Sequence, residues 1–135
     1  MKKFKFLPPY SKPGKTNFSA TRNRSGVYLI KENAKLVYVG MSGGNLYRTL
    51  YRHFEAWTHS LQDVVTYQGR LKKHKYTVRV VLCTPAQALR LEKILIIKNR
   101  PRDNSNKYQN HEIDFRDEKI EHEYSHALTT AEMPF

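Results

Sequence analysis

The pattern of apolar and polar positions first becomes regular at residues 26–41, where the β-rich segments GVYLIK and LVYVGM flank a polar loop. This pattern predicts a β-hairpin. A loop symmetric about Asn33 pairs Tyr28 with Tyr38, so that both phenols share one face of the sheet. A two-residue loop instead pairs Tyr28 with Val39 and separates the phenols. The sequence leaves both registers open. In the symmetric register, the core-facing side consists of Val27, Leu29, Val37 and Val39.

Helical periodicity follows the hairpin in the segment LYRTLYRHFEAW, which begins at residue 46. Apolar side chains recur there at helical spacing and predict one buried stripe. Ser42 or Asn45, in the turn before it, is the expected N-cap. The stripe consists of Leu46, Leu50, Phe54 and Trp57.

A strand and a second helix complete the predicted domain. The alternation in YTVRVVLC, which begins at residue 76, predicts a strand. Thr84 followed by Pro85 is a typical helix start, and the helix is expected to end at Pro101. Glu92 lies beside the apolar stripe of this helix and away from its polar face.

Charge divides the chain into three parts. Residues 1–25 hold seven Lys and Arg, three prolines and no acid, and predict an extended basic arm that orders on a partner. The folded domain is expected at 26–108. Residues 1–110 together carry 22 Lys and Arg against 5 Asp and Glu. An acidic tail is expected at 109–135, and residues 111–135 within it carry 2 Lys and Arg against 7 Asp and Glu.

A strongly basic body favours a polyanionic partner, most often nucleic acid, over the alternative of a merely solvated basic surface. Cys83 is the one cysteine, which excludes an internal disulfide. Lys5 and the prolines after it interrupt the apolar start too early for a signal peptide. Apolar runs are far too short to span a membrane, so we expect a soluble, cytoplasmic protein.

Two sets of residues, in order along the chain, resemble the GIY-YIG nuclease superfamily. The first is GVY at 26–28 and YVG at 38–40, with nine residues between the tyrosines, then Ser42, then Arg48 eight residues past Gly40. The second is ALRLEKILIIKNRPRDN, which carries Glu92, Pro101 and Asn104. The resemblance covers residues 26–104.

The resemblance implies an α/β (α+β) fold, with a compact three-stranded antiparallel sheet flanked by helices, and metal-dependent hydrolysis of DNA. It implies that Tyr28 and Tyr38 line the active face, that Arg48 holds the scissile phosphate, and that Glu92 binds Mg²⁺ or Mn²⁺. Asn104 would brace the site or orient the glutamate. Gly26, Gly40 and Ser42 belong to the same motifs. A guanidinium suits phosphate, one carboxylate suits a hydrated Mg²⁺, and a nearby metal and arginine would favour a Tyr28 phenolate that activates water.

One departure from the superfamily concerns the helix of Arg48. Many members carry a histidine four residues after the arginine, whereas here that position is Arg52. His53 is one residue late and about 140° around an ideal helix from Arg48, so we expect it to matter little. Tyr51 lies closer to the arginine and is the expected substitute, if Tyr28 does not act alone. Without a substitute the site would be slow or inactive.

Further basic residues are expected to contact nucleic acid: Arg52, Arg70, Lys72, Lys73, Lys98, Arg100 and Arg102. Two other functions stay open. One is a binding module of the same fold without efficient catalysis. The other is a zinc hydrolase that uses HEYSH at 122–126, whose two histidines are one helical turn apart. A catalytic zinc needs a third protein ligand, and Glu132 is the one plausible candidate after this motif. The sequence does not indicate an oligomeric state.

Overall fold

A computed structural model describes residues 2–3, 5–55, 65–104, 107–108 and 119. Trp57, the HEYSH motif and almost all of the predicted acidic tail lie outside the described residues. The strands are β1 (Lys2–Lys3), β2 (Tyr10–Lys12), β3 (Lys15–Thr16), β4 (Gly26–Glu32), β5 (Lys35–Ser42) and β6 (Tyr76–Leu82). The α-helices are α1 (Leu46–Tyr51) and α2 (Pro85–Asn99), and short 3₁₀ turns are η1 (Ser19–Thr21), η2 (Gln68–Arg70) and η3 (Arg102–Asn104).

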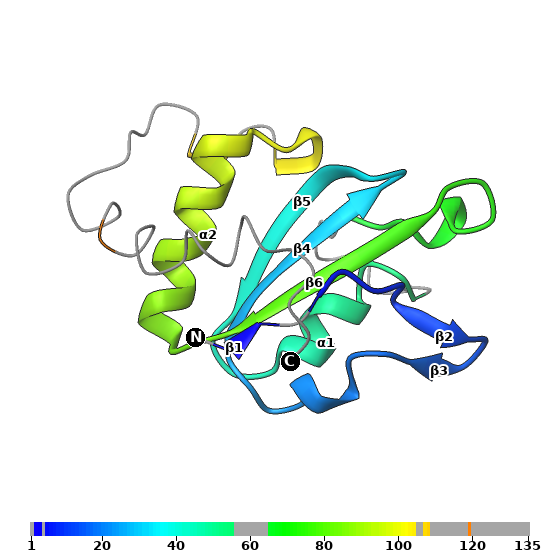
Figure 1. Ribbon diagram of the computed structural model, residues 1–135, viewed down its shortest axis with the longest axis horizontal. Coiled ribbons are helices and arrows are strands. Elements are labelled where there is room, and N and C mark those ends of the chain that lie inside the picture. Colours follow the sequence, from blue (N-terminus) through cyan, green and yellow to red (C-terminus); the bar gives the residue numbers. More distant parts are fainter. Residues whose placement is uncertain (1, 4, 56–64, 105–106, 109–118, 120–135) are drawn as a thin grey trace.

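The main sheet is antiparallel throughout, with the order β1-β6-β4-β5, and α1 and α2 cover its opposite faces (Figure 1). Three long strands form its body, and the two-residue β1 extends the edge beside β6. β2 and β3 form a separate small hairpin. The expected α+β fold with a three-stranded antiparallel centre is confirmed. No helix in the described part of the chain is long and apolar enough to cross a membrane.

Both faces of the sheet are buried, because alternate residues of each strand enter two separate apolar clusters. Tyr28, Val78 and Leu50 belong to the cluster on the α1 face. Leu29 and Leu91 belong to the cluster beneath α2. The predicted strand at 76–82 alternates as expected between the two sides.

The start of α2 follows its sequence signals. The Thr84 side chain accepts a hydrogen bond from the backbone N–H of Gln87 at 3.2 Å, and the Gln87 side chain accepts one from the N–H of Thr84 at 3.1 Å. This capping box satisfies two backbone donors that the helix cannot pair. At the other end, Arg100 takes a left-handed conformation with φ of 43°, and Pro101 follows.

The hairpin adopts neither expected register. Asn33 and Ala34 form a two-residue turn with positive φ, but the ladder shifts by one residue between Ile30 and Lys31. Tyr28 therefore pairs with Gly40, and Tyr38 pairs with Ile30. Both phenols still lie on one face, as diagonal neighbours. The same shift turns Val37 into the α1-side cluster, away from Val27, Leu29 and Val39, so its expected place beside them is wrong.

Residues 5–25 belong to the folded body, and the expectation of a separate arm is wrong for them. Phe18 and Thr21 are fully buried. Leu7 exchanges backbone hydrogen bonds with Val78 of β6, at 2.9 and 2.7 Å. The Tyr51 hydroxyl donates to the carbonyl oxygen of Pro9 and accepts from the N–H of Phe18. Tyr51 thus anchors the N-terminal segment, which corrects its expected role as a catalytic substitute.

Candidate active site

Tyr28 and His53 form a buried hydrogen-bonded pair between β4 and the end of α1. The Tyr28 hydroxyl oxygen lies 2.7 Å from His53 Nε2, and His53 Nδ1 lies 2.6 Å from the carbonyl oxygen of Val65. A carbonyl oxygen only accepts, so Nδ1 carries a proton and donates it. In the neutral ring Nε2 is then the acceptor, and Tyr28 donates to it. The Val65 carbonyl therefore holds His53 in the tautomer that receives the Tyr28 proton.

His53 lies on a different side of the helix axis from Arg48, as the helical wheel predicts, but that side is buried against Tyr28. The expectation that His53 matters little does not follow from its angle to Arg48. α1 ends at Tyr51, and the next turn has 3₁₀ hydrogen bonds from the N–H of His53 to the carbonyl of Leu50 and from the N–H of Phe54 to that of Tyr51. His53 is only 3% exposed. The sequence signal was its spacing, because on an ideal helix His53 lies about 60° from Leu50, on the buried stripe.

Gly40 is the reason that the Tyr28 ring fits against β5. A Cβ at position 40 would lie 2.3 Å from Cζ and from the hydroxyl oxygen of Tyr28. The ring therefore lies across the glycine that its own strand pairing places opposite it. Gly26 has a comparable reason, since a Cβ there would lie 2.1 Å from the carbonyl oxygen of Val81. Gly40 therefore serves close packing at the site, and Gly26 serves close packing between β4 and β6.

Tyr38 joins the pair from the neighbouring strand. Its ring centroid lies 6.1 Å from that of Tyr28 and 4.7 Å from that of His53. Tyr28 is 1% exposed, whereas Tyr38 is half-buried. Tyr38 is therefore the phenol that solvent reaches, with the Tyr28–His53 pair behind it.

Burial fixes the protonation states in this cluster. Desolvation, followed by the phenol of Tyr38 and the carboxylate of Glu92, raises the pKa of Tyr28 well above 10. Desolvation also lowers the pKa of His53, and the charge of Arg52 adds to that effect. At neutral pH the phenol is protonated and the imidazole is neutral. Burial thus works against the expected Tyr28 phenolate.

Glu92 projects from α2 and is 3% exposed. Its charge raises the pKa of both Tyr28 and Tyr38, so the carboxylate acts electrostatically on both phenols. Glu92 Oε1 accepts a hydrogen bond from Lys107 Nζ at 2.9 Å. Burial acts to lower the pKa of Lys107, but the ion pair outweighs this and the net pKa is raised. Lys107 has no motif or periodicity that would have marked it in the sequence.

The donors around Glu92 determine which metal fits. Among the described residues, no group of three or more His, Cys, Asp or Glu comes together. One carboxylate does not make a zinc site, which needs at least three protein ligands. It does suit Mg²⁺ or Mn²⁺, which are commonly held by one or two carboxylates, with water and substrate phosphate completing the shell. Glu92 fits such an ion once its bond to Lys107 is exchanged.

Asn104 braces the outer edge of β5. Its Oδ1 accepts from the N–H of Val39 at 2.8 Å, and its Nδ2 donates to the carbonyl oxygen of Val39 at 3.0 Å. The backbone N–H and C=O of Val39, which lies between Tyr38 and Gly40 on this edge strand, are thereby both hydrogen-bonded. Of the two expected roles for Asn104, the geometry agrees with bracing the site, since both side-chain atoms are engaged by Val39.

Arg48 and Ser42 lie at the N-terminal end of α1. The Ser42 hydroxyl accepts from the N–H groups of Gly44 and Asn45, and the Asn45 side chain caps α1. Arg48 is exposed, and the described part of the chain holds no ion-pair or hydrogen-bond partner for its guanidinium. Arg52 lies closer to the pair, since its charge lowers the pKa of His53. Arg48 is therefore not joined by contact to the tyrosines or to Glu92.

The other predicted phosphate contacts fall into two groups. Arg70 and Arg102 both donate to Glu32, and Arg102 also pairs with Asp103 at 2.9 Å. The remaining four are exposed, and of these Arg100 donates to the carbonyl oxygen of Tyr108. These four are Lys72, Lys73, Lys98 and Arg100. Arg70 and Arg102 therefore belong to an internal ion-pair network, in which they bind carboxylates of the same chain.

Glu32 is the centre of that network, and its pKa leads to a prediction on stability. Hydrogen bonding from Arg102, together with the Tyr76 hydroxyl, outweighs desolvation and lowers the pKa of Glu32 to about 2. A carboxylate whose pKa is lower in the folded protein stabilises the fold fully at pH values above its pKa in the unfolded chain. This stabilisation is lost as the pH falls through the pKa in the folded protein. We expect Glu32→Gln to lower the free energy of unfolding at pH 7 by about 2 kcal/mol.

The deficit should shrink between about pH 4.5 and 2, where the parent carboxylate also becomes protonated. Chemical denaturation over this pH range checks the prediction, with the exposed Glu55→Gln as the matched control. A deficit that does not change with pH would show that the lowered pKa of Glu32 contributes nothing to folding.

Comparison of the chain with protein-family models, curated proteins and solved structures finds no significant match.

Proposed function

We propose that this protein is a metal-dependent endonuclease that hydrolyses DNA phosphodiester bonds, as its resemblance to the GIY-YIG nucleases implies. The observation that carries the proposal is the hydrogen-bonded Tyr28–His53 pair, with Tyr38 beside it and the buried Glu92, whose charge raises the pKa of both phenols. Groups that move protons, adjacent to a carboxylate that suits Mg²⁺, are what this hydrolysis requires.

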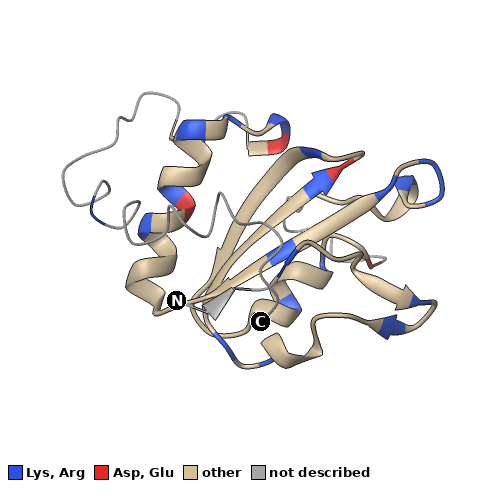
Figure 2. Cartoon of the chain, in the orientation of Figure 1, with Lys and Arg blue, Asp and Glu red and all other residues tan. Residues whose placement is uncertain are grey.

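The distribution of charge supports an anionic substrate. Lys and Arg occur on most elements of the described chain, whereas acids are few (Figure 2). The acids in the described ranges are Glu32, Glu55, Glu92 and Asp103. All of these except Glu55 already form ion pairs with lysine or arginine of the same chain. Exposed basic residues such as Lys72 and Lys73 can contact phosphates, and the exposed Arg48 supplies a planar donor for one of them.

The arrangement of the three rings supports a proton relay. Tyr38, which solvent reaches, accepts a proton from the attacking water and gives its own to the Tyr28 oxygen. Tyr28 at the same time passes its proton to His53 Nε2, and His53 ends the step as the imidazolium. Nδ1 stays bonded to the Val65 carbonyl throughout. The two phenols thus exchange their expected order, with Tyr38 at the water and Tyr28 behind it.

Glu92 is the residue that would hold the metal. A bound Mg²⁺ or Mn²⁺ supplies charge neutralisation at the phosphate and lowers the pKa of water. Arg48 and Arg52 would bind the phosphate oxygens on the side of α1. His53 remains the final proton acceptor, because its lowered pKa keeps it neutral at physiological pH.

Lys107 should compete with the metal for Glu92. Its ammonium bonds to Oε1 of a carboxylate that is 4% exposed, while Lys107 is itself 50% exposed and free to leave. Lys107→Met removes this competing cation, so we expect the affinity for Mn²⁺ to rise about fivefold, the equivalent of one partly exposed ion pair. Calorimetric titration of Mn²⁺ without DNA measures the effect.

Lys35→Met is the matched control, since Lys35 is an exposed lysine at the hairpin turn. It should leave Mn²⁺ affinity unchanged. Equal affinities for the parent and Lys107→Met would show that Lys107 does not compete for the site.

A plasmid-nicking assay tests the proposed function. Protein freed of metal by a chelator should leave the plasmid intact, and added Mg²⁺ or Mn²⁺ should restore nicking. The second candidate, a DNA-binding module of this fold without cleavage, is favoured by the Lys107–Glu92 ion pair, which occupies the carboxylate. DNA binding without nicking in either metal would establish that alternative. The predicted zinc hydrolase at 122–126 lies outside the described residues, and zinc analysis of the purified protein addresses it.

A further inference from the structure

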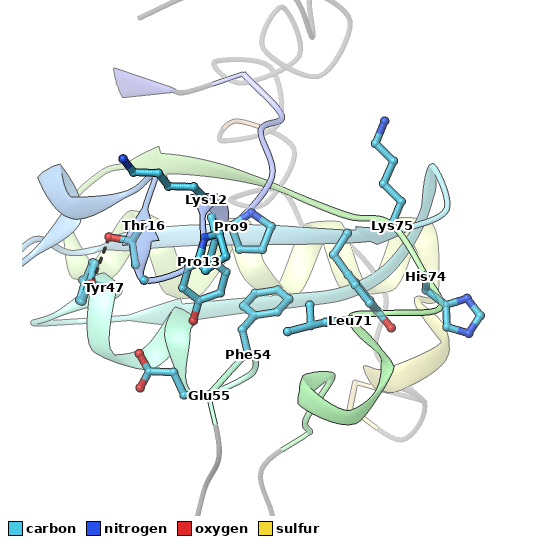
Figure 3. Close-up of a pocket in the computed structure, with 13 residues that line it drawn as sticks. Pro9, Lys12, Pro13, Thr16, Tyr47, Phe54, Glu55, Leu71, His74 and Lys75 are labelled. Atoms are coloured by element: carbon cyan, nitrogen blue, oxygen red, sulfur yellow. Dashed lines mark hydrogen bonds between the residues drawn. The ribbon is translucent and has the colours of Figure 1, made fainter.

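A groove of about 740 Å³ lies between three segments that are far apart in the sequence (Figure 3). One wall is the β2–β3 hairpin with Pro9 before it, and another comprises α1 and the turn that follows it. The third is the segment from Leu71 to Tyr76, which leads into β6. This volume is in the range of pockets that bind small molecules or single groups of a larger ligand.

The groove is lined by aromatic rings that neighbouring contacts hold in place. Phe54 and Tyr76 are 2% and 4% exposed, with ring centroids 5.9 Å apart. Tyr10 and Tyr47 both pack against Tyr51, at centroid distances of 5.4 and 4.6 Å. The Tyr47 hydroxyl is also 3.1 Å from Thr16 Oγ1. Phe54 and Tyr76 therefore form the floor, and the half-buried rings of Tyr10 and Tyr47 are the ones that a ligand can reach. Because these rings are fixed, a flat ligand can stack on them with little loss of side-chain entropy.

The rim of the groove is basic. Lys12 and Lys75 are exposed and extend from opposite ends of the groove, and His74 lies beside Lys75 (Figure 3). Glu55 is the acid among the lining residues. A flat aromatic surface between ammonium groups is complementary to a ligand that combines a ring with an anion, as a nucleotide does.

We propose that this groove binds an unpaired nucleotide of a DNA strand, with its base against the aromatic lining and its phosphates at Lys12 and Lys75. A paired base is stacked within the duplex and presents only its edge, so the lining favours single-stranded over double-stranded nucleic acid. Stacking of this kind contributes to single-strand binding without selecting a particular base.

The groove adjoins the candidate active site. Phe54 lines it and directly follows His53, and the Tyr67 ring contacts both, at 6.0 Å from Phe54 and 6.2 Å from His53. If the proposed nuclease function is correct, on which this point rests, a strand held in the groove passes near the Tyr28–His53 pair. The substrate class is then DNA with an unpaired segment next to the bond that is cut.

Binding of fluorescent oligothymidylate and of a blunt duplex of equal length, both in chelator, tests the proposal. The parent should bind oligothymidylate more tightly. The double variant Lys12→Glu/Lys75→Glu should lose at least tenfold in that affinity, whereas Lys5→Glu/Lys35→Glu changes the same charge at exposed positions outside the groove and should lose less than threefold. Equal losses in the two double variants would overturn the proposal, as would tighter binding of the duplex.

A second variant tests stacking without a change of charge. Tyr10→Leu keeps an apolar side chain but removes the ring, and should weaken oligothymidylate binding roughly five- to 150-fold, the range for one stacked base. Unchanged binding by a folded Tyr10→Leu protein would contradict a stacked base. Plasmid nicking by the same proteins separates the two proposals. If the parent nicks the plasmid and the groove variants bind oligothymidylate as tightly as the parent does, the groove proposal fails and the nuclease proposal stands.

Discussion

Tyr28→Phe should slow DNA cleavage by about 10² to 10⁴, the usual loss when acid–base help is removed. The substitution deletes one hydroxyl, so it breaks the 2.7 Å bond to His53 while the ring still fills the space against Gly40. Tyr38→Phe and His53→Ala should cause losses of similar size, because each interrupts the same relay. Single-turnover cleavage rates at saturating metal measure these effects.

The double variant Tyr28→Phe/His53→Ala distinguishes a relay from two independent contributions. Residues that act as a unit are not additive, so the double variant should be about as slow as the slower single one. A rate loss in the double variant equal to the product of the two single losses would contradict the relay. Because His53 must be neutral and burial lowers its pKa, activity should persist below pH 6.5 and fall only at lower pH.

Glu92→Ala should abolish cleavage and preserve DNA binding. Loss of the proposed metal ligand removes several kcal/mol of transition-state stabilisation, so we expect a fall of at least about 10³ in rate. The variant also removes a negative charge and leaves Lys107 without its partner, so affinity for DNA should stay the same or rise. Fluorescence anisotropy without metal measures the affinity. Weaker binding by a folded Glu92→Ala would show that the carboxylate supports the DNA interface in another way.

Arg48→Ala should behave differently from Glu92→Ala. It removes an exposed cation, so both binding and cleavage should weaken. The contrast between the two variants therefore separates phosphate binding from metal binding within one site.

Much of the fold follows from local signals in the sequence. The alternation of β6 and the Thr84–Gln87 capping box depend on residues close together in the chain, so their patterns determined strand and helix correctly. The hairpin was also predicted, but its register depends on a one-residue shift after Ile30 that no local pattern marks. The sequence thus offered a shared face for Tyr28 and Tyr38 in one of its two registers, and the structure reaches that shared face through a third register.

The candidate site was only partly predictable, because several of its contacts join distant residues. His53 lies on the buried side of α1, and no local pattern shows that its partner there is Tyr28 from β4. Lys107 reaches Glu92 only because the chain reverses after α2. Residues 5–25 looked like an arm from their charge and prolines, yet Phe18 and Thr21 are fully buried in the domain. Each of these depends on tertiary packing.

The most direct test of the nuclease site is the rate of plasmid nicking by the parent and Glu92→Ala, purified identically and assayed in the same Mg²⁺ and salt. Leu89→Ala, at an exposed position of the same helix α2, is the matched control. We predict that the parent and Leu89→Ala nick the plasmid at equal rates, and that Glu92→Ala leaves it intact. Nicking by Glu92→Ala at the parental rate would contradict the assignment of catalysis to this site.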